Sequence, residues 1–177
     1  MNFEEKIHQD LHQFLLMEDE VDERLPESAD INDKWPAIAE SYLPDGLREF
    51  RDYSAVSLGW MMYVGMAVAQ CWDEDWQVYG NMPDLYAYLR DKEGFDRMDE
   101  YIRRTVLSLK NPAYDDTEKL VQQCAERTLS ALRREPVEPG TNEAFEVYVT
   151  CLRQLYLMGS AVQLHRLNYR MEKLRLC

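Results

Sequence analysis

The feature that most constrains this chain is a run of twenty residues without a formal charge, Tyr53–Trp72. Its length is that of a helix that spans a membrane. The run nevertheless contains serines and Gln70, and it stands alone in an otherwise polar chain. A helix that is apolar on every side is also what the centre of a helical bundle requires. Because no second apolar span accompanies it, we expect a buried central helix at about 47–72 and no membrane partner.

Small residues recur at helical spacing within this run. They allow the backbones of neighbouring helices to approach closely, at a cost in helix propensity. We therefore expect close helix packing along two tracks. One track consists of Ala55, Gly59, Ala67 and Cys71, and the other of Ser57, Gly65 and Ala69.

The rest of the chain has the pattern of amphipathic helices. Glycine and proline number seven each, which is too few for several short strands with their turns. The last segment, 141–176, contains no proline, and its acidic residues come early and its basic residues late, as the helix dipole favours. Its apolar stripe shifts near Gly159-Ser160, so it either bends there or buries a different face. We predict one all-α domain over residues 1–177, a single-domain bundle of six to seven helices with a long C-terminal helix.

The formal net charge is −13, and it is unevenly distributed. Residues 1–91 carry 20 acidic and 6 basic residues, a balance of −14, whereas residues 92–177 carry 13 and 14, a balance of +1. The acidic half would be repelled by phosphate backbones and by anionic membranes, so we expect no nucleic acid as a partner. Such a charge is explained by a need for solubility. It would also attract a basic protein partner.

Cysteine use and the first residues indicate the compartment. The four cysteines are scattered, and no C-x-x-C motif occurs. The chain starts with acidic residues where a secretion signal would have basic ones followed by an apolar run. We expect reduced thiols and a cytoplasmic protein.

The best metal-like pattern lies in the first segment. Glu5, His8 and His12 have the spacing that places them on one helical face. Ferritin-like di-metal bundles need a second E-x-x-H motif, but the residue three positions before His165 is Val162. Two solvent-facing histidines are the simpler interpretation, and we predict no cofactor.

A second candidate site combines acidic and aromatic residues at the end of the central run. Such a cluster could hold a cation or a basic peptide. It lacks the alternating ligand spacing of an EF-hand loop, and a helix end with solvated acids and buried tryptophans explains it as well. The residues are Trp72, Asp73, Glu74, Asp75, Trp76 and Tyr79.

The far end of the last segment suggests an interface. Its apolar stripe continues beyond the length that a small bundle covers, so a second copy of the chain could bury it. The candidate dimer residues are Leu164, Leu167, Met171 and Leu174.

Catalytic motifs are lacking. The sequence contains no G-x-S-x-G, no Walker A and no G-x-G-x-x-G. The hypothesis that follows is a non-catalytic binding or regulatory module that acts through helical surfaces, for example by sequestering a basic partner. The alternative is a helical bundle that binds a metal or small ligand, a class that includes enzymes. The residues that would line its interior pocket are Trp60, Met61, Met62, Tyr63 and Met66.

Overall fold

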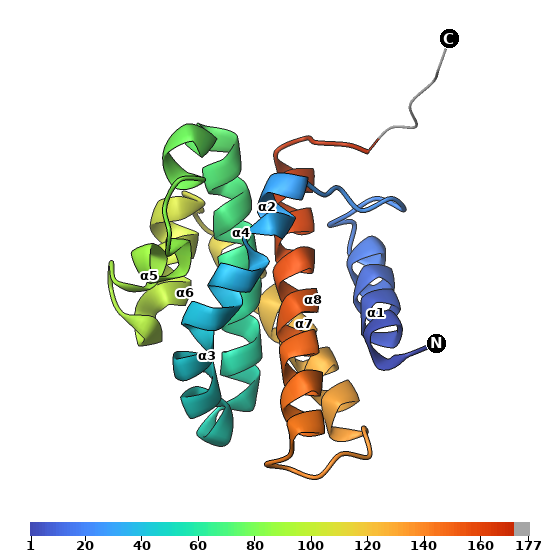
Figure 1. The fold of residues 1–177 in the computed structure, drawn as a ribbon. Coiled ribbons are helices and arrows are strands. Elements are labelled where there is room, and N and C mark those ends of the chain that lie inside the picture. The colour runs from blue at the N-terminus through green and yellow to red at the C-terminus, as the bar shows by residue number, and fades with distance from the viewer. Residues whose placement is uncertain (172–177) are drawn as a thin grey trace.

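Two long helices form the centre of the molecule in the computed structural model, which describes residues 1–171. Helix α4 (Ser54–Tyr79) and helix α8 (Asn142–Arg166) lie side by side along most of their lengths (Figure 1). Every regular element of the described residues is helical. The predicted all-α bundle around a central apolar helix is therefore confirmed.

The other helices surround this pair. Helix α1 packs against α7 and α8 on one side, and α3, α5 and α6 lie on the opposite side (Figure 1). Helix α2 lies beside the C-terminal half of α4. The surrounding elements are α1 (Phe3–Met17), α2 (Ala29–Asp33), α3 (Trp35–Asp52), α5 (Leu85–Arg90), η1 (Phe95–Arg97), α6 (Met98–Tyr101), η2 (Ile102–Val106) and α7 (Ala113–Arg133).

Helix α4 is buried along most of its apolar stretch, between Ser57 and Cys71, where other helices pack against it. By length and composition it could cross a membrane, but 72% of its most apolar window is buried inside the fold. The predicted start at residue 47 was wrong, since 47–52 form the end of α3 and the non-helical backbone of Tyr53 separates the two helices. The helix also continues to Tyr79, with a bend at Asp75 (φ −163°, ψ 82°).

Glycines bring α4 and α8 into backbone contact. A β-carbon on Gly65 would overlap the carbonyl oxygen of Tyr156, and one on Gly159 would overlap the carbonyl oxygen of Met62. Gly59 instead faces α7, where a β-carbon would lie 3.3 Å from Cγ1 of Val121. The two glycines of α4 therefore serve the close packing expected of the small-residue tracks.

Helix α8 is continuous through Gly159-Ser160 and ends earlier than predicted. Thr141 caps its first turn by accepting a hydrogen bond from the backbone N–H of Ala144 at 3.2 Å. The helix stops at Arg166 because Asn168 adopts a left-handed conformation (φ 71°). The backbone N–H of Tyr169 then donates to the carbonyl of Leu164 at 2.9 Å, which completes a Schellman motif.

Candidate functional site

A cavity of about 260 Å³ opens between α4, α6 and α7, and we call it the α4–α7 pocket. It combines an apolar wall with carboxylates at its edge. Small residues line part of it, Ala55 and Gly59 from α4 and Ala125 from α7. The lining residues are Ala55, Val56, Gly59, Trp60, Tyr63, Asp99, Glu118, Val121, Gln122, Ala125 and Glu126.

Two aromatic side chains form one wall of the pocket. The indole N–H of Trp60 donates to the carbonyl of Phe95 at 2.7 Å, which fixes the orientation of the ring. The ring of Tyr63 meets that of Trp60 edge to face, with centroids 5.8 Å apart. Because the indole N–H is already paired, the ring of Trp60 offers the cavity an apolar and electron-rich surface.

A buried arginine lies behind the carboxylates. Arg103 is only 2% exposed, and its Nη1 donates to Glu118 at 2.7 Å and its Nη2 to Asp99 at 3.1 Å. Its guanidinium also lies 5.5 Å from the ring centre of Tyr63 and 4.2 Å from that of Tyr114. Arg103 belongs to the π-helix η2, a rare element that is frequent at functional sites. The side chain is therefore held by two ion pairs and two aromatic rings.

The pocket has more negative than positive groups. Asp99, Glu118 and Glu126 line it, and Arg103 neutralises one of these charges. Burial raises the pKa of the Asp99 carboxyl, and the neighbouring Arg103 opposes that rise. The Glu118 side chain is 44% exposed, so its carboxylate faces both the arginine and the solvent. An organic cation with an apolar body fits this combination of carboxylates and aromatic wall.

Of the interior residues predicted to line a pocket, two reach this cavity. Trp60 and Tyr63 line it, whereas Met61, Met62 and Met66 are fully buried in the core. The methionines fill the space between α4 and its neighbours, as flexible apolar side chains do.

The predicted acidic and aromatic cluster lies at the other end of α4, where its carboxylates have partners within the chain. Asp73 accepts a hydrogen bond from the hydroxyl of Tyr169 at 2.7 Å, and Glu74 accepts one from Nε2 of Gln70 at 2.9 Å. Asp75 lies at the bend of the helix. These contacts give the acids a structural role, and their binding of a cation or peptide stays a prediction.

The aromatic residues of that cluster contact neighbouring helices. The indole N–H of Trp72 donates to Asp30 of α2 at 3.1 Å. Nζ of Lys34 lies 5.8 Å from the ring centre of Trp76. The ring of Tyr79 lies against that of Tyr88. All three side chains are partly buried and pack against the hydrophobic core.

The predicted metal ligands lie on α1, where the rings of His8 and His12 meet edge to face with centroids 6.1 Å apart. The Glu5 carboxylate accepts from the backbone N–H of Asn2 in a capping box. His8 Nδ1 lies 2.9 Å from Oε1 of Gln154, and His12 Nε2 lies 3.1 Å from the carbonyl of Asp22. Within residues 1–171, no three His, Cys, Asp or Glu side chains are grouped so that they could hold a metal ion. Metal binding by this set stays a hypothesis that nothing here tests.

The predicted dimer residues differ in exposure. Leu164 is 2% exposed and belongs to the core of its own chain. Leu167 follows the end of α8 and is half-buried, as is Met171. Leu174 lies outside the described residues.

Sequence reasoning missed the charged residues of the α4–α7 pocket. The spacing of Asp99 and Arg103, four positions apart, was the available signal of an ion pair within a helix, but nothing in the sequence connects Arg103 with Glu118. Comparison with known proteins found no matching family model, no similar curated protein and no similar solved structure.

Proposed function

We propose that this protein is a non-catalytic binding module that accepts a cationic side chain of a basic partner in the α4–α7 pocket. The observation that supports the proposal is the arrangement of carboxylates around an apolar cavity. Asp99, Glu118 and Glu126 line it, Trp60 provides an aromatic wall, and Arg103 is a single, buried counter-charge. A lysine or arginine side chain of a partner would place its methylene groups on the wall and its charge at the carboxylates.

The charge of the whole chain supports the same choice of partner. A net charge of −13 attracts a basic protein over a distance and raises the rate of encounter, although the effect weakens with salt. A cationic side chain that enters the pocket would then lose little free energy on leaving water, because the site supplies both carboxylates and an electron-rich ring.

The described thiols are unsuited to nucleophilic chemistry, which favours binding over catalysis. Cys71, Cys124 and Cys151 are buried and free. Burial raises the pKa of each of these thiols to about 12, so that the reactive thiolate is scarce at neutral pH. Free buried thiols also suit the reducing cytoplasm, which is the compartment that we propose.

The first test uses a short capped peptide with one arginine as the probe. Binding is followed by NMR through the indole N–H of Trp60, at low salt. We expect Glu126→Gln to weaken binding about two- to fivefold, as removal of a partly exposed charge pair does. Glu138→Gln removes the same charge at an exposed position of the α7–α8 connection, outside the pocket, and should leave binding unchanged.

The result can also refute the proposal. A peptide with glutamine in place of arginine should not shift the Trp60 signal. If it binds as well as the arginine peptide, or if the two glutamate variants lose affinity equally, the pocket does not select cations. General attraction to an acidic surface would then explain the binding.

The alternative function, a bundle that binds a small ligand, has the volume of the α4–α7 pocket in its favour. Native mass spectrometry of the protein, purified without added ligand, separates the two possibilities. A retained mass that disappears on denaturation would favour a resident small molecule. Its absence, together with arginine-peptide binding, would favour the module proposed above.

A further inference from the structure

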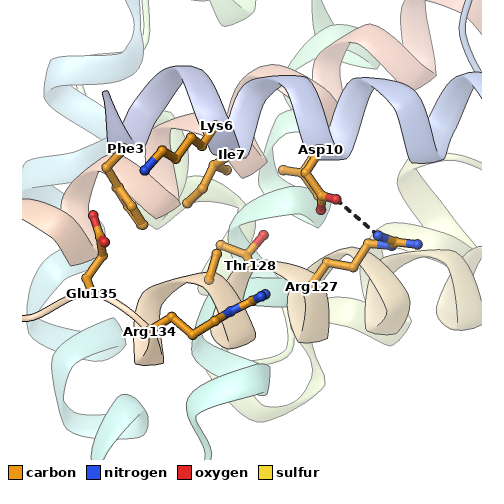
Figure 2. A pocket seen from close by; sticks show the side chains of 10 residues that line it. Phe3, Lys6, Ile7, Asp10, Arg127, Thr128, Arg134 and Glu135 are labelled. Atoms are coloured by element: carbon orange, nitrogen blue, oxygen red, sulfur yellow. Dashed lines mark hydrogen bonds and ion pairs between the residues drawn. The ribbon is translucent and has the colours of Figure 1, made fainter. Parts of the chain in front are cut away.

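A second cavity, of about 370 Å³, lies between α1 and α7 (Figure 2). It shares no lining residue with the α4–α7 pocket. We call it the α1–α7 cavity. Residues of α1 form one wall, and residues of α7 together with Arg134 and Glu135 form the other. The lining residues are Phe3, Lys6, Ile7, Asp10, Leu11, Arg127, Thr128, Ala131, Arg134 and Glu135.

Three basic side chains line this cavity. Lys6 comes from α1, and Arg127 and Arg134 come from α7 and the residue that follows it. Two acidic side chains, Asp10 and Glu135, oppose them, which leaves a formal excess of one positive charge. The excess contrasts with the net charge of −13 of the whole chain.

The arginines are positioned by contacts within the protein. Arg127 donates to Asp10 at 3.2 Å, and its guanidinium lies 4.4 Å from the ring centre of Phe14. Nε of Arg134 donates to the carbonyl of Ser130 at 3.2 Å. In Figure 2 the side chain of Arg134 lies at the bottom of the view and extends along α7 toward Arg127.

Two of the three cations have no carboxylate partner. Within residues 1–171, neither Lys6 nor Arg134 forms an ion pair. Only the Nε of Arg134 is used in the hydrogen bond to Ser130, so its two terminal nitrogens remain as a planar pair of donors. A guanidinium fork of this kind matches the geometry of a phosphate or a carboxylate.

Part of the inner surface of the cavity is apolar. Ile7 and Leu11 are buried beneath it, and the ring of Phe3 stands at one end. Cations at the rim and an apolar floor together suit a ligand with an oxyanion at one end and a hydrophobic group at the other.

We propose that the α1–α7 cavity binds an organic oxyanion, with Lys6 and Arg134 contacting the phosphate or carboxylate and Phe3 contacting its apolar part. Arg127 adds positive charge while it remains paired with Asp10. This site is separate from the α4–α7 pocket and takes a ligand of opposite charge. It does not depend on the proposed binding of a basic partner.

The test uses phenyl phosphate and benzoate as probes, with isothermal titration calorimetry at low salt. We expect Arg134→Gln and Lys6→Gln each to weaken binding about three- to tenfold, because each removes one charged hydrogen-bond donor. Arg133→Gln and Lys119→Gln remove the same charge from exposed positions outside the cavity. These two controls should bind as the unchanged protein does.

Further probes identify the chemistry that is recognised. Benzylamine, which has the same ring and a positive charge, should not bind. If phenyl phosphate binds more tightly than benzoate, the site is assigned to phosphates. The reverse order of affinity assigns it to carboxylates. Equal loss of affinity in Arg133→Gln and Arg134→Gln, or benzylamine binding as strong as that of the anions, would overturn the proposal. Thermal unfolding of each variant verifies that the fold is unchanged.

Discussion

The contact between α4 and α8 makes one substitution informative. Replacing Gly65 by alanine places a β-carbon on top of the Tyr156 carbonyl oxygen, 3.0 Å from the carbonyl carbon and 3.1 Å from the backbone nitrogen of Ser160. All three atoms belong to the backbone of α8, so no side chain can rotate to make room. The two central helices would have to separate, and the core between them would lose packing.

The size of the effect follows from two opposing terms. Excess volume in a well-packed core costs about 1–3 kcal/mol, and a clash with backbone belongs at the upper end of that range. Alanine is about 1 kcal/mol more favourable than glycine inside a helix. We therefore expect Gly65→Ala to lower the free energy of unfolding by about 2 kcal/mol, which for a chain of this length lowers the Tm by about 4–8 °C.

Gly59 supplies a matched control on the same helix. A β-carbon there would lie 3.3 Å from Cγ1 of Val121 and 3.5 Å from Cβ of Ala125, and these atoms are in side chains of α7. A shift of a few tenths of an ångström accommodates it, so the gain in helix propensity remains. Gly59→Ala should change stability by between zero and about +1 kcal/mol.

The assay is urea unfolding of both variants, followed by circular dichroism at 222 nm. Gly159→Ala should behave like Gly65→Ala, because the two glycines meet at one crossing. The double variant should cost less than the sum, since one separation of the helices relieves both clashes. A Gly65→Ala protein that unfolds at or above the urea midpoint of the unchanged protein would refute the backbone contact.

Three further predictions concern charge, thiols and self-association. Arg103→Gln should cost about 3 kcal/mol in urea unfolding, because two partly buried carboxylates lose their partner. Arg103→Met should cost at least as much, because methionine offers these carboxylates no hydrogen-bond donor; a cost near zero for both variants would contradict this. The pKa of the Cys124 thiol is about 12 in the folded protein and about 8.5 in the unfolded chain. Because the unfolded chain releases the proton at lower pH, the free energy of unfolding should fall as pH rises from about 9 to 12. The fall should be smaller in Cys124→Ala. Leu167→Glu with Leu174→Glu should lower the mass in native mass spectrometry if the chain dimerises through its C-terminal residues; an unchanged mass would exclude that interface.

The fold could be predicted from the sequence where one local pattern decides the structure. The uncharged run around Gly65 had to be buried, and burial on every side places it at the centre. The start of α8 at Thr141 follows from local capping chemistry. The break at Tyr53 and the bend at Asp75 carry no comparable local signal, so the predicted helix began and ended at the wrong residues. The end of α8 was also missed. The charge pattern predicted a helix to residue 176, but the left-handed conformation of Asn168 ends it earlier.

The α4–α7 pocket could not be predicted, because its charged residues come from separate segments. Arg103 and Asp99 lie in one turn, but Glu118 joins them only after α7 packs beside η2. In the sequence, a single glutamate near the start of a helix is explained equally well by helix capping or by solubility. Only the placement of the buried guanidinium identifies Glu118 as part of a site.

The two proposed sites share a physical origin in α7. Ala125 of α7 lines the α4–α7 pocket, and Ala131 of the same helix lines the α1–α7 cavity. Small residues at these positions leave space on each side of the helix. The charged residues on its exposed ridge then lie at the rims of both cavities, Glu126 beside the α4–α7 pocket and Arg127 beside the α1–α7 cavity. Enlarging either alanine to leucine should therefore close one cavity and leave the other intact, which would separate the two binding activities within one helix.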